Sequence, residues 1–87
     1  MRFVRAFGGW GVAPGQFKYP WGIAVVRGLL VVAEDSGHRV QVLSLKGVPL
    51  QVVPLGGVLI GVCSDERQVW VADRVLNQLH VLKLQNA

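Results

Sequence analysis

The sequence repeats one pattern of short apolar runs and tight turns after 39 residues. When the chain is shifted by this spacing, Gly61 falls on Gly22, and Val71-Ala72 falls on Val32-Ala33. The turns between the runs also fall on one another, without a gap. A repeat of this kind restricts the chain to folds in which copies of one small unit stack side by side.

Each apolar run has the length and the Val- and Leu-rich composition of a β-strand. The chain contains eleven Gly and four Pro residues, most of which lie in the turns and loops around these runs. The sequence therefore predicts an all-β chain. We expect strands at about 22–26, 29–33, 38–44 and 50–53 in the first half, at about 60–64, 68–73 and 78–84 in the second, and at 2–7.

Most of these strands are apolar on both faces, whereas a strand with one face in water alternates apolar and polar residues. Continuous apolar runs are typical of strands that are covered on both sides. The repeat length also lies close to that of β-propeller blades, which are four-stranded antiparallel units of about 40–50 residues. Both observations favour a propeller.

The first copy of the repeat resembles an NHL repeat. The residues that carry the resemblance are Pro14-Gly15-Gln16-Phe17, Pro20-Trp21-Gly22-Ile23-Ala24-Val25, Val32-Ala33-Glu34 and His38-Arg39-Val40-Gln41-Val42-Leu43. The copy departs from the family pattern at Glu34, where Asp is expected, and at Gly37, where Asn is expected. The second copy is degenerate: it keeps Gly61 and Val71-Ala72-Asp73 but lacks the Pro-Gly-Gln-Phe segment.

The resemblance implies part of a six-bladed NHL-type β-propeller with two four-stranded antiparallel blades in this chain. On the family pattern, residues 1–87 are a single NHL-repeat unit with blade 1 at about 20–54 and blade 2 at about 58–87. Residues 2–7 would be an outer strand of a neighbouring blade.

Two blades cannot close a ring, so each end would expose an apolar sheet face. Two accounts stay open at this point. In the first, the chain self-associates as a homotrimer, and the strand at 2–7 of one copy pairs with the strand at 78–84 of the next. In the second, the chain is a fragment of a longer propeller protein that supplies the missing blades.

The residues that could support catalysis are few. Cys63 is the only cysteine, which allows no zinc cluster of the usual kind. The two histidines, His38 and His80, cannot supply the three ligands of a catalytic zinc site. Glu34, Asp35 and Asp73 lie at predicted turns, and Arg39 is close enough across its own turn to pair with Glu34 or Asp35. We therefore predict no enzyme activity, no cofactor and no metal, although the family includes a peptide-amidating lyase.

For binding, the predicted topology brings the loops at 8–21 and 54–59 to the same face as the turns at 34–37 and 73–77. This face gathers the candidate ligand-binding residues, which are Trp10, Lys18, Tyr19, Trp21, Arg39 and Arg74. Aromatic and cationic side chains in such a mixture can bind an extended peptide or stack on the bases of single-stranded RNA. The alternative is that the tryptophans and Phe17 fill gaps between blades.

Two function classes therefore stay open. The first is a protein- or peptide-interaction module or scaffold, and the second is an RNA-binding propeller of the tripartite-motif type. The formal net charge of +4 is compatible with an RNA or acidic partner but establishes neither. The Pro and Gly residues within 47–64 argue against a membrane span, and no signal peptide is apparent, so we expect a cytoplasmic protein without a membrane partner.

Overall fold

Seven β-strands alternate with short turns and loops. The computed structural model describes residues 1–36, 38–57, 59–65 and 67–83, but not the side chains of Leu59, Ile60 and Cys63. The side chain of Cys63 therefore falls outside the described part. The strands are β1 (Pro20–Val26), β2 (Leu29–Glu34), β3 (Arg39–Ser44), β4 (Pro49–Pro54), β5 (Leu59–Ser64), β6 (Gln68–Asp73) and β7 (Gln78–Lys83).

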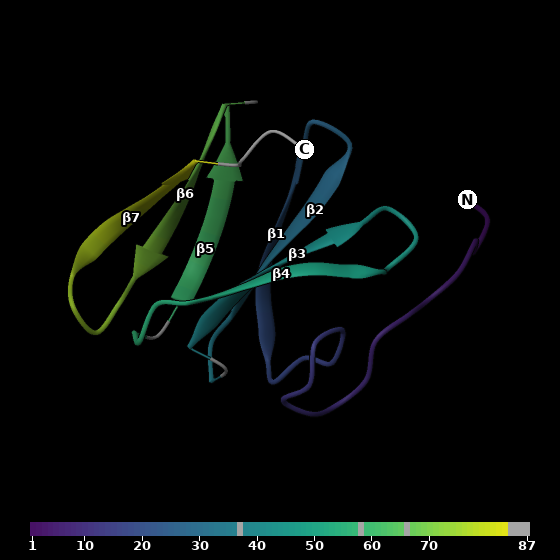
Figure 1. Cartoon of the computed structure of the whole chain (residues 1–87), viewed down its shortest axis with the longest axis horizontal. Coiled ribbons are helices and arrows are strands. Elements are labelled where there is room, and N and C mark those ends of the chain that lie inside the picture. The colour runs from purple at the N-terminus through teal and green to yellow at the C-terminus, as the bar shows by residue number, and fades with distance from the viewer. Residues whose placement is uncertain (37, 58, 66, 84–87) are drawn as a thin grey trace.

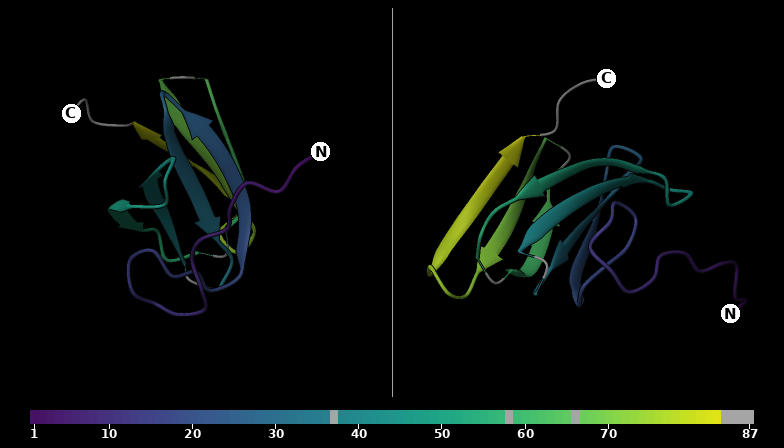
Figure 2. Two further views of the ribbon diagram at one scale, coloured as in Figure 1. Left: turned by 90° about the vertical axis from the view of Figure 1, so that its right-hand side faces the viewer. Right: turned by 60° about the horizontal axis from the view of Figure 1, so that its bottom comes forward.

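These strands coincide closely with the predicted ones, and the all-β class is confirmed. They form a four-stranded sheet in the order β1-β2-β3-β4 and a three-stranded sheet in the order β5-β6-β7, with every pair antiparallel. The two twisted sheets lie side by side, and the N-terminal segment lies beyond the first sheet (Figures 1 and 2). In the described residues, no helix is long and apolar enough to cross a membrane.

The repeat extends from the sequence to the strand register. Gly22 pairs with Ala33 in the first sheet, and Gly61 pairs with Ala72 in the second, 39 residues later. In both sheets the register shifts immediately before this glycine, as at a β-bulge. The turn before β3 contains His38 with φ 55°, and the turn before β7 contains its counterpart Asn77 with φ 53°. The degenerate second copy has thus kept the backbone of the first.

The core lies between the two sheets. Valine side chains from the inner face of the first sheet pack against Val69 and Val71 of β6. The sheets approach most closely where β1 and β2 lie against β5. Toward the outer strands they separate, and a cavity of about 170 Å³ opens between Val40 and Val42 on one side and Leu82 on the other.

Each sheet also has an outer face, which points away from the other sheet and carries exposed apolar side chains. Because side chains alternate along a strand, the outer residues of β1 lie between those that face the core. We call the outer face of the first sheet the outer β1 face and that of the second sheet the outer β7 face. The outer β1 face carries Trp21, Ile23 and Val25, and the outer β7 face carries Trp70, Leu79 and Val81.

Residues 2–7, for which the sequence predicts an outer strand of a neighbouring blade, are exposed and belong to neither sheet. Within the chain, Arg5 donates from Nη2 to the carbonyl oxygen of Leu45 at 3.0 Å. The predicted partner of this segment belongs to a neighbouring blade beyond this chain. The pairing therefore stays a prediction.

The close approach of the sheets at Gly22 gives a first prediction. A Cβ atom on Gly22 would lie 3.1 Å from Cγ1 and 3.2 Å from the backbone nitrogen of Val62, whereas a Cβ on Gly61 meets nothing within 4 Å. We expect Gly22→Val to lower the free energy of unfolding by about 1–3 kcal/mol, because the extra atoms force the sheets apart. Gly61→Val is the matched control at the equivalent position.

The measurement is urea unfolding followed by far-UV circular dichroism, with the chain dilute enough that contacts between copies do not contribute. Equal stability of the two variants would show that the sheets do not approach each other at Gly22.

Candidate functional site

The N-terminal loop, residues 8–19, leads into β1 and is closed by its own backbone. The amide of Phe17 donates to the carbonyl oxygen of Gly9 at 2.7 Å, and the amide of Gly11 donates to the carbonyl oxygen of Phe17 at 3.3 Å. A third bond joins the amide of Gln16 to the carbonyl oxygen of Ala13 at 2.9 Å. These bonds fold the loop into a compact turn beside the first sheet.

The loop is attached to the sheet by the carboxylate of Glu34, at the end of β2. Glu34 is fully buried. Its Oε1 accepts from the amide of Lys18 at 2.8 Å, and its Oε2 accepts from Nε of Arg39 at 2.7 Å and Nε2 of Gln41 at 2.8 Å. A buried carboxylate is tolerated when donors satisfy it in this way. Of the two partners that the sequence offers for Arg39, Glu34 and Asp35, the structure shows the pair with Glu34.

Arg39 and Gln41 then reach from β3 to the backbone of the loop. Arg39 donates to the carbonyl oxygens of Val12 at 2.7 Å and Gln16 at 2.9 Å. Gln41 donates to the carbonyl oxygen of Gln16 at 2.6 Å and accepts from the amide of Gly15 at 2.9 Å. A loop without a strand partner thus has its backbone groups satisfied by side chains.

The second copy keeps a buried acid at the same place but uses it differently. Asp73 is the counterpart of Glu34, and its Oδ1 accepts from the amides of Val75 at 3.0 Å and Leu76 at 3.1 Å. Its Oδ2 lies 2.9 Å from Nε2 of His80, the counterpart of Gln41. The hydrogen bond to His80, followed by the bonds from these amides, lowers the pKa of Asp73 below its ordinary value of 3.8.

On the solvent side of the N-terminal loop, two aromatic rings meet over a hollow. Trp10 and Tyr19 are 64% and 60% exposed, and their rings meet edge to face with centroids 5.2 Å apart. Together they border a hollow of about 350 Å³, which we call the Trp10 hollow. Its lining residues are Phe7, Gly9, Trp10, Phe17, Tyr19 and Pro20.

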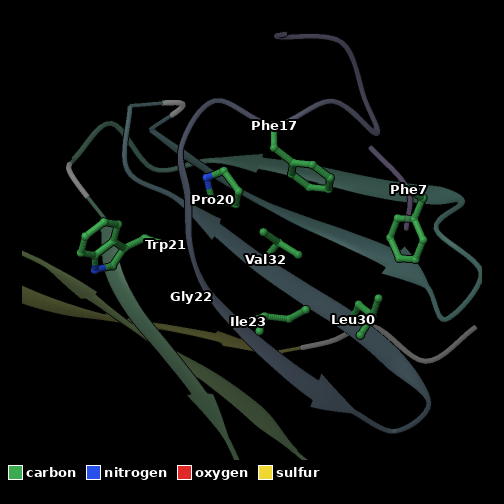
Figure 3. Close-up of a pocket in the computed structure, with 8 residues that line it drawn as sticks. All are labelled: Phe7, Phe17, Pro20, Trp21, Gly22, Ile23, Leu30 and Val32. Carbon is green, nitrogen blue, oxygen red and sulfur yellow. The ribbon is translucent and has the colours of Figure 1, made fainter. Parts of the chain in front are cut away.

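A second hollow adjoins the first and extends onto the outer β1 face. It has a volume of about 310 Å³ and shares Phe7, Phe17 and Pro20 with the Trp10 hollow. We call it the Ile23 hollow. In Figure 3 its side chains surround Val32, with Trp21 at one end. The residues specific to it are Trp21, Gly22, Ile23, Leu30 and Val32.

The structure divides the six candidate ligand-binding residues among different places. Trp10 and Tyr19 come together, and Trp21 lines the adjoining hollow. Arg39 lies beneath the loop with a side chain only 12% exposed. Arg74 lies in the turn between β6 and β7, on the other sheet (Figure 1).

Lys18, the sixth candidate, is half-buried beside Tyr19, and its amide is bonded to Glu34. Sequence reasoning missed Gln41. Its position in the middle of an apolar strand, aligned with His80 by the repeat, was the available signal.

The described residues contain no group of three His, Cys, Asp or Glu side chains that could hold a metal ion. His38 lies in the turn before β3, where its Nδ1 is 2.5 Å from the carbonyl oxygen of Gly57. The other histidine is paired with Asp73. Both histidines therefore have structural partners within the chain.

Residues 17–43 match the family model described as NHL repeat. The match begins in the N-terminal loop and covers β1, β2 and most of β3, so it includes Glu34, Arg39 and Gln41. It confirms the resemblance inferred for the first copy. No curated protein matches the chain.

The buried position of Glu34 predicts a large effect of neutralising it. Glu34→Gln removes the charge that pairs with Arg39 and turns its amide group toward a present donor, either the amide of Lys18 or the side chains of Arg39 and Gln41. We expect a loss of about 3 kcal/mol in the free energy of unfolding and faster hydrogen exchange at the amide of Lys18. Asp65→Asn is the control, because Asp65 is exposed and its Oδ1 accepts backbone bonds that Asn can also accept. A loss of similar size in both variants would contradict the role given to Glu34.

The lowered pKa of Asp73 predicts how stability depends on acid. A carboxyl whose pKa is lower in the folded state stabilises the fold fully above its ordinary value of 3.8, and this contribution is lost as the pH falls through the folded value. The Asp73→Asn variant has no carboxyl at this position, so its stability does not contain this pH-dependent contribution. We therefore expect a shallower decline in stability below about pH 4 in the variant than in the wild type, measured by urea unfolding across that range. Parallel declines would refute this contribution.

Proposed function

Residues 17–43 are an NHL repeat, and on that basis we propose that the chain is a non-enzymatic propeller module that binds a protein or peptide at the Trp10 hollow. NHL repeats are generally non-catalytic scaffolds that mediate protein interactions. The fold does not identify the ligand, so the choice of site depends on the surface of this chain.

The observation that carries the proposal is the exposed pair of Trp10 and Tyr19 on a well-anchored loop. Large aromatic side chains give much contact area and have few rotatable bonds, and they are common at the energetic centres of interfaces. The side chains of Arg39 and Gln41 hold the loop in place before any ligand arrives. Binding therefore costs little ordering of the loop.

We assign β1–β4 to blade 1, at about 20–54, and β5–β7 to blade 2, at about 58–87, within a six-bladed ring. The matching register of the two sheets and their wedge-like packing support this division. Residues 2–7 would provide the fourth strand of a neighbouring blade. The ring closes as a homotrimer in this proposal, and the alternative is a longer propeller chain of which these blades are part.

The distribution of positive charge favours a peptide over RNA. Phosphate contacts need cations beside the aromatic platform. Arg39 instead uses its guanidinium on Glu34 and on loop carbonyl oxygens, and Arg74 lies on the other sheet. Only Lys18 is next to the aromatic pair in sequence.

The test is selection from a displayed library of random peptides, with the affinity of one selected peptide then measured for each variant. We expect Trp10→Ala to weaken binding about 30-fold, which corresponds to about 2 kcal/mol, because the ring contributes most of the contact area. Arg74→Ala is the control and should leave the affinity unchanged.

A parallel titration with the single-stranded RNA poly(U) separates the two function classes. Affinity that falls steeply with salt and is lost on combining Lys18→Ala with Arg74→Ala would overturn the peptide proposal in favour of RNA. Binding of the selected peptide at equal strength by wild type and Trp10→Ala would overturn the assignment of the site.

A further inference from the structure

The two outer faces of the molecule occupy the same repeat positions as the two faces that pack together inside it. The outer residues Ile23 and Leu30 are the counterparts of Val62 and Val69, which the second sheet turns toward the first. In the same way, the outer residues Leu79 and Val81 are the counterparts of the inner residues Val40 and Val42, and Trp70 is the counterpart of Val31. The internal interface therefore serves as a template for pairing the outer faces.

Equivalent residues have very different exposed fractions in the internal interface and on the outer faces. Val40 and Val31 are 0% and 1% exposed in the internal interface, whereas their counterparts Leu79 and Trp70 are 68% and 37% exposed. Ile23 on the opposite face is 61% exposed. Apolar faces of this kind mark interaction sites.

The shapes of the two outer faces fit the packing seen in the internal interface at two points. Inside the molecule, Val62 packs against Gly22, where no side chain intervenes. By the repeat, Ile23 of one copy would meet Gly61 of another, and Gly61 has open space above it. Trp70 would lie over Leu30 and its neighbours, where the Ile23 hollow of about 310 Å³ leaves more room than Val31 needs.

We infer that a second copy of this chain docks its outer β7 face onto the outer β1 face of the first, with Trp70 in the Ile23 hollow. The inference rests on the two-blade architecture of the proposed function, but it does not depend on the ligand at the Trp10 hollow. Because every copy carries both faces, the contact is head-to-tail and can repeat until a ring closes. In the six-bladed ring of the proposal, three copies close it.

The test uses the mass of the particle in solution, measured by light scattering during size-exclusion chromatography. We expect the wild type at about three times the chain mass of 9.5 kDa. Ile23→Asp and Leu79→Asp each place a charge in the contact and should each give a monomer. Both residues are exposed within the chain, so the variants should keep a cooperative unfolding transition, which is checked by circular dichroism.

Mixing the two variants distinguishes a head-to-tail contact from a symmetric one. The Ile23→Asp chain keeps an intact outer β7 face, and the Leu79→Asp chain keeps an intact outer β1 face, so the mixture should form a heterodimer. If outer β1 faces paired with each other, Leu79→Asp would dimerise without a partner, and this result would overturn the inference. A folded wild-type monomer would overturn it as well.

Two controls separate this inference from the proposed function. Val75→Asp adds the same charge at an exposed turn outside both faces and should keep the wild-type mass. Trp10→Ala should also keep that mass while binding the selected peptide about 30-fold more weakly. Peptide binding by a folded monomer would overturn the docking of copies but not the ligand site. An assembled chain that selects no peptide would overturn the ligand site but not the docking.

Discussion

The first sheet and its N-terminal loop depend on the buried carboxylate of Glu34. Removing a carboxylate from water is costly, so the fold has to bring donors to both of its oxygens. Those donors come from the loop, through the amide of Lys18, and from β3, through Arg39 and Gln41. One charge thus fixes the position of the loop relative to two strands. Its contribution is to select a single loop conformation, since apolar packing between the sheets supplies the bulk of the stabilisation.

The second copy shows the same requirement met by a shorter side chain. Asp73 has one methylene group fewer than Glu34, and it accepts from the amides of its own turn instead of from a preceding loop. Gly57 lies so close to Asp73 that a Cβ atom there would overlap the carboxylate. The position that holds Lys18 in the first copy is therefore occupied by glycine in the second. The shorter acid accompanies the shorter connection, because the second copy lacks the Pro-Gly-Gln-Phe segment and Asp73 has no such loop to hold.

Strand positions and pairing could be predicted because the spacing of apolar runs and turns reflects backbone geometry directly. An ion pair of Arg39 across its own turn could be predicted too, but the sequence did not decide between Glu34 and Asp35 as its partner. The Trp10 hollow could not, because it depends on how a Gly-rich loop closes on itself. The bonds from Arg39 to both Glu34 and the loop carbonyl oxygens could not be predicted either, because the sequence alone suggests a surface cation that is available to ligands. Its carbonyl partners in the loop become neighbours only when the chain folds.

The missing side chain at Gly22 also determines the shape of the unit. Because Val62 can approach the backbone there, the two sheets are nearest at β1 and β5 and diverge toward their outer strands. A unit that is thinner along one edge is a wedge, and wedges placed edge to edge follow an arc instead of a straight line. The angle of each wedge fixes how many complete one revolution. The absence of a side chain at Gly22 would thus contribute to the curvature of an array built from such units.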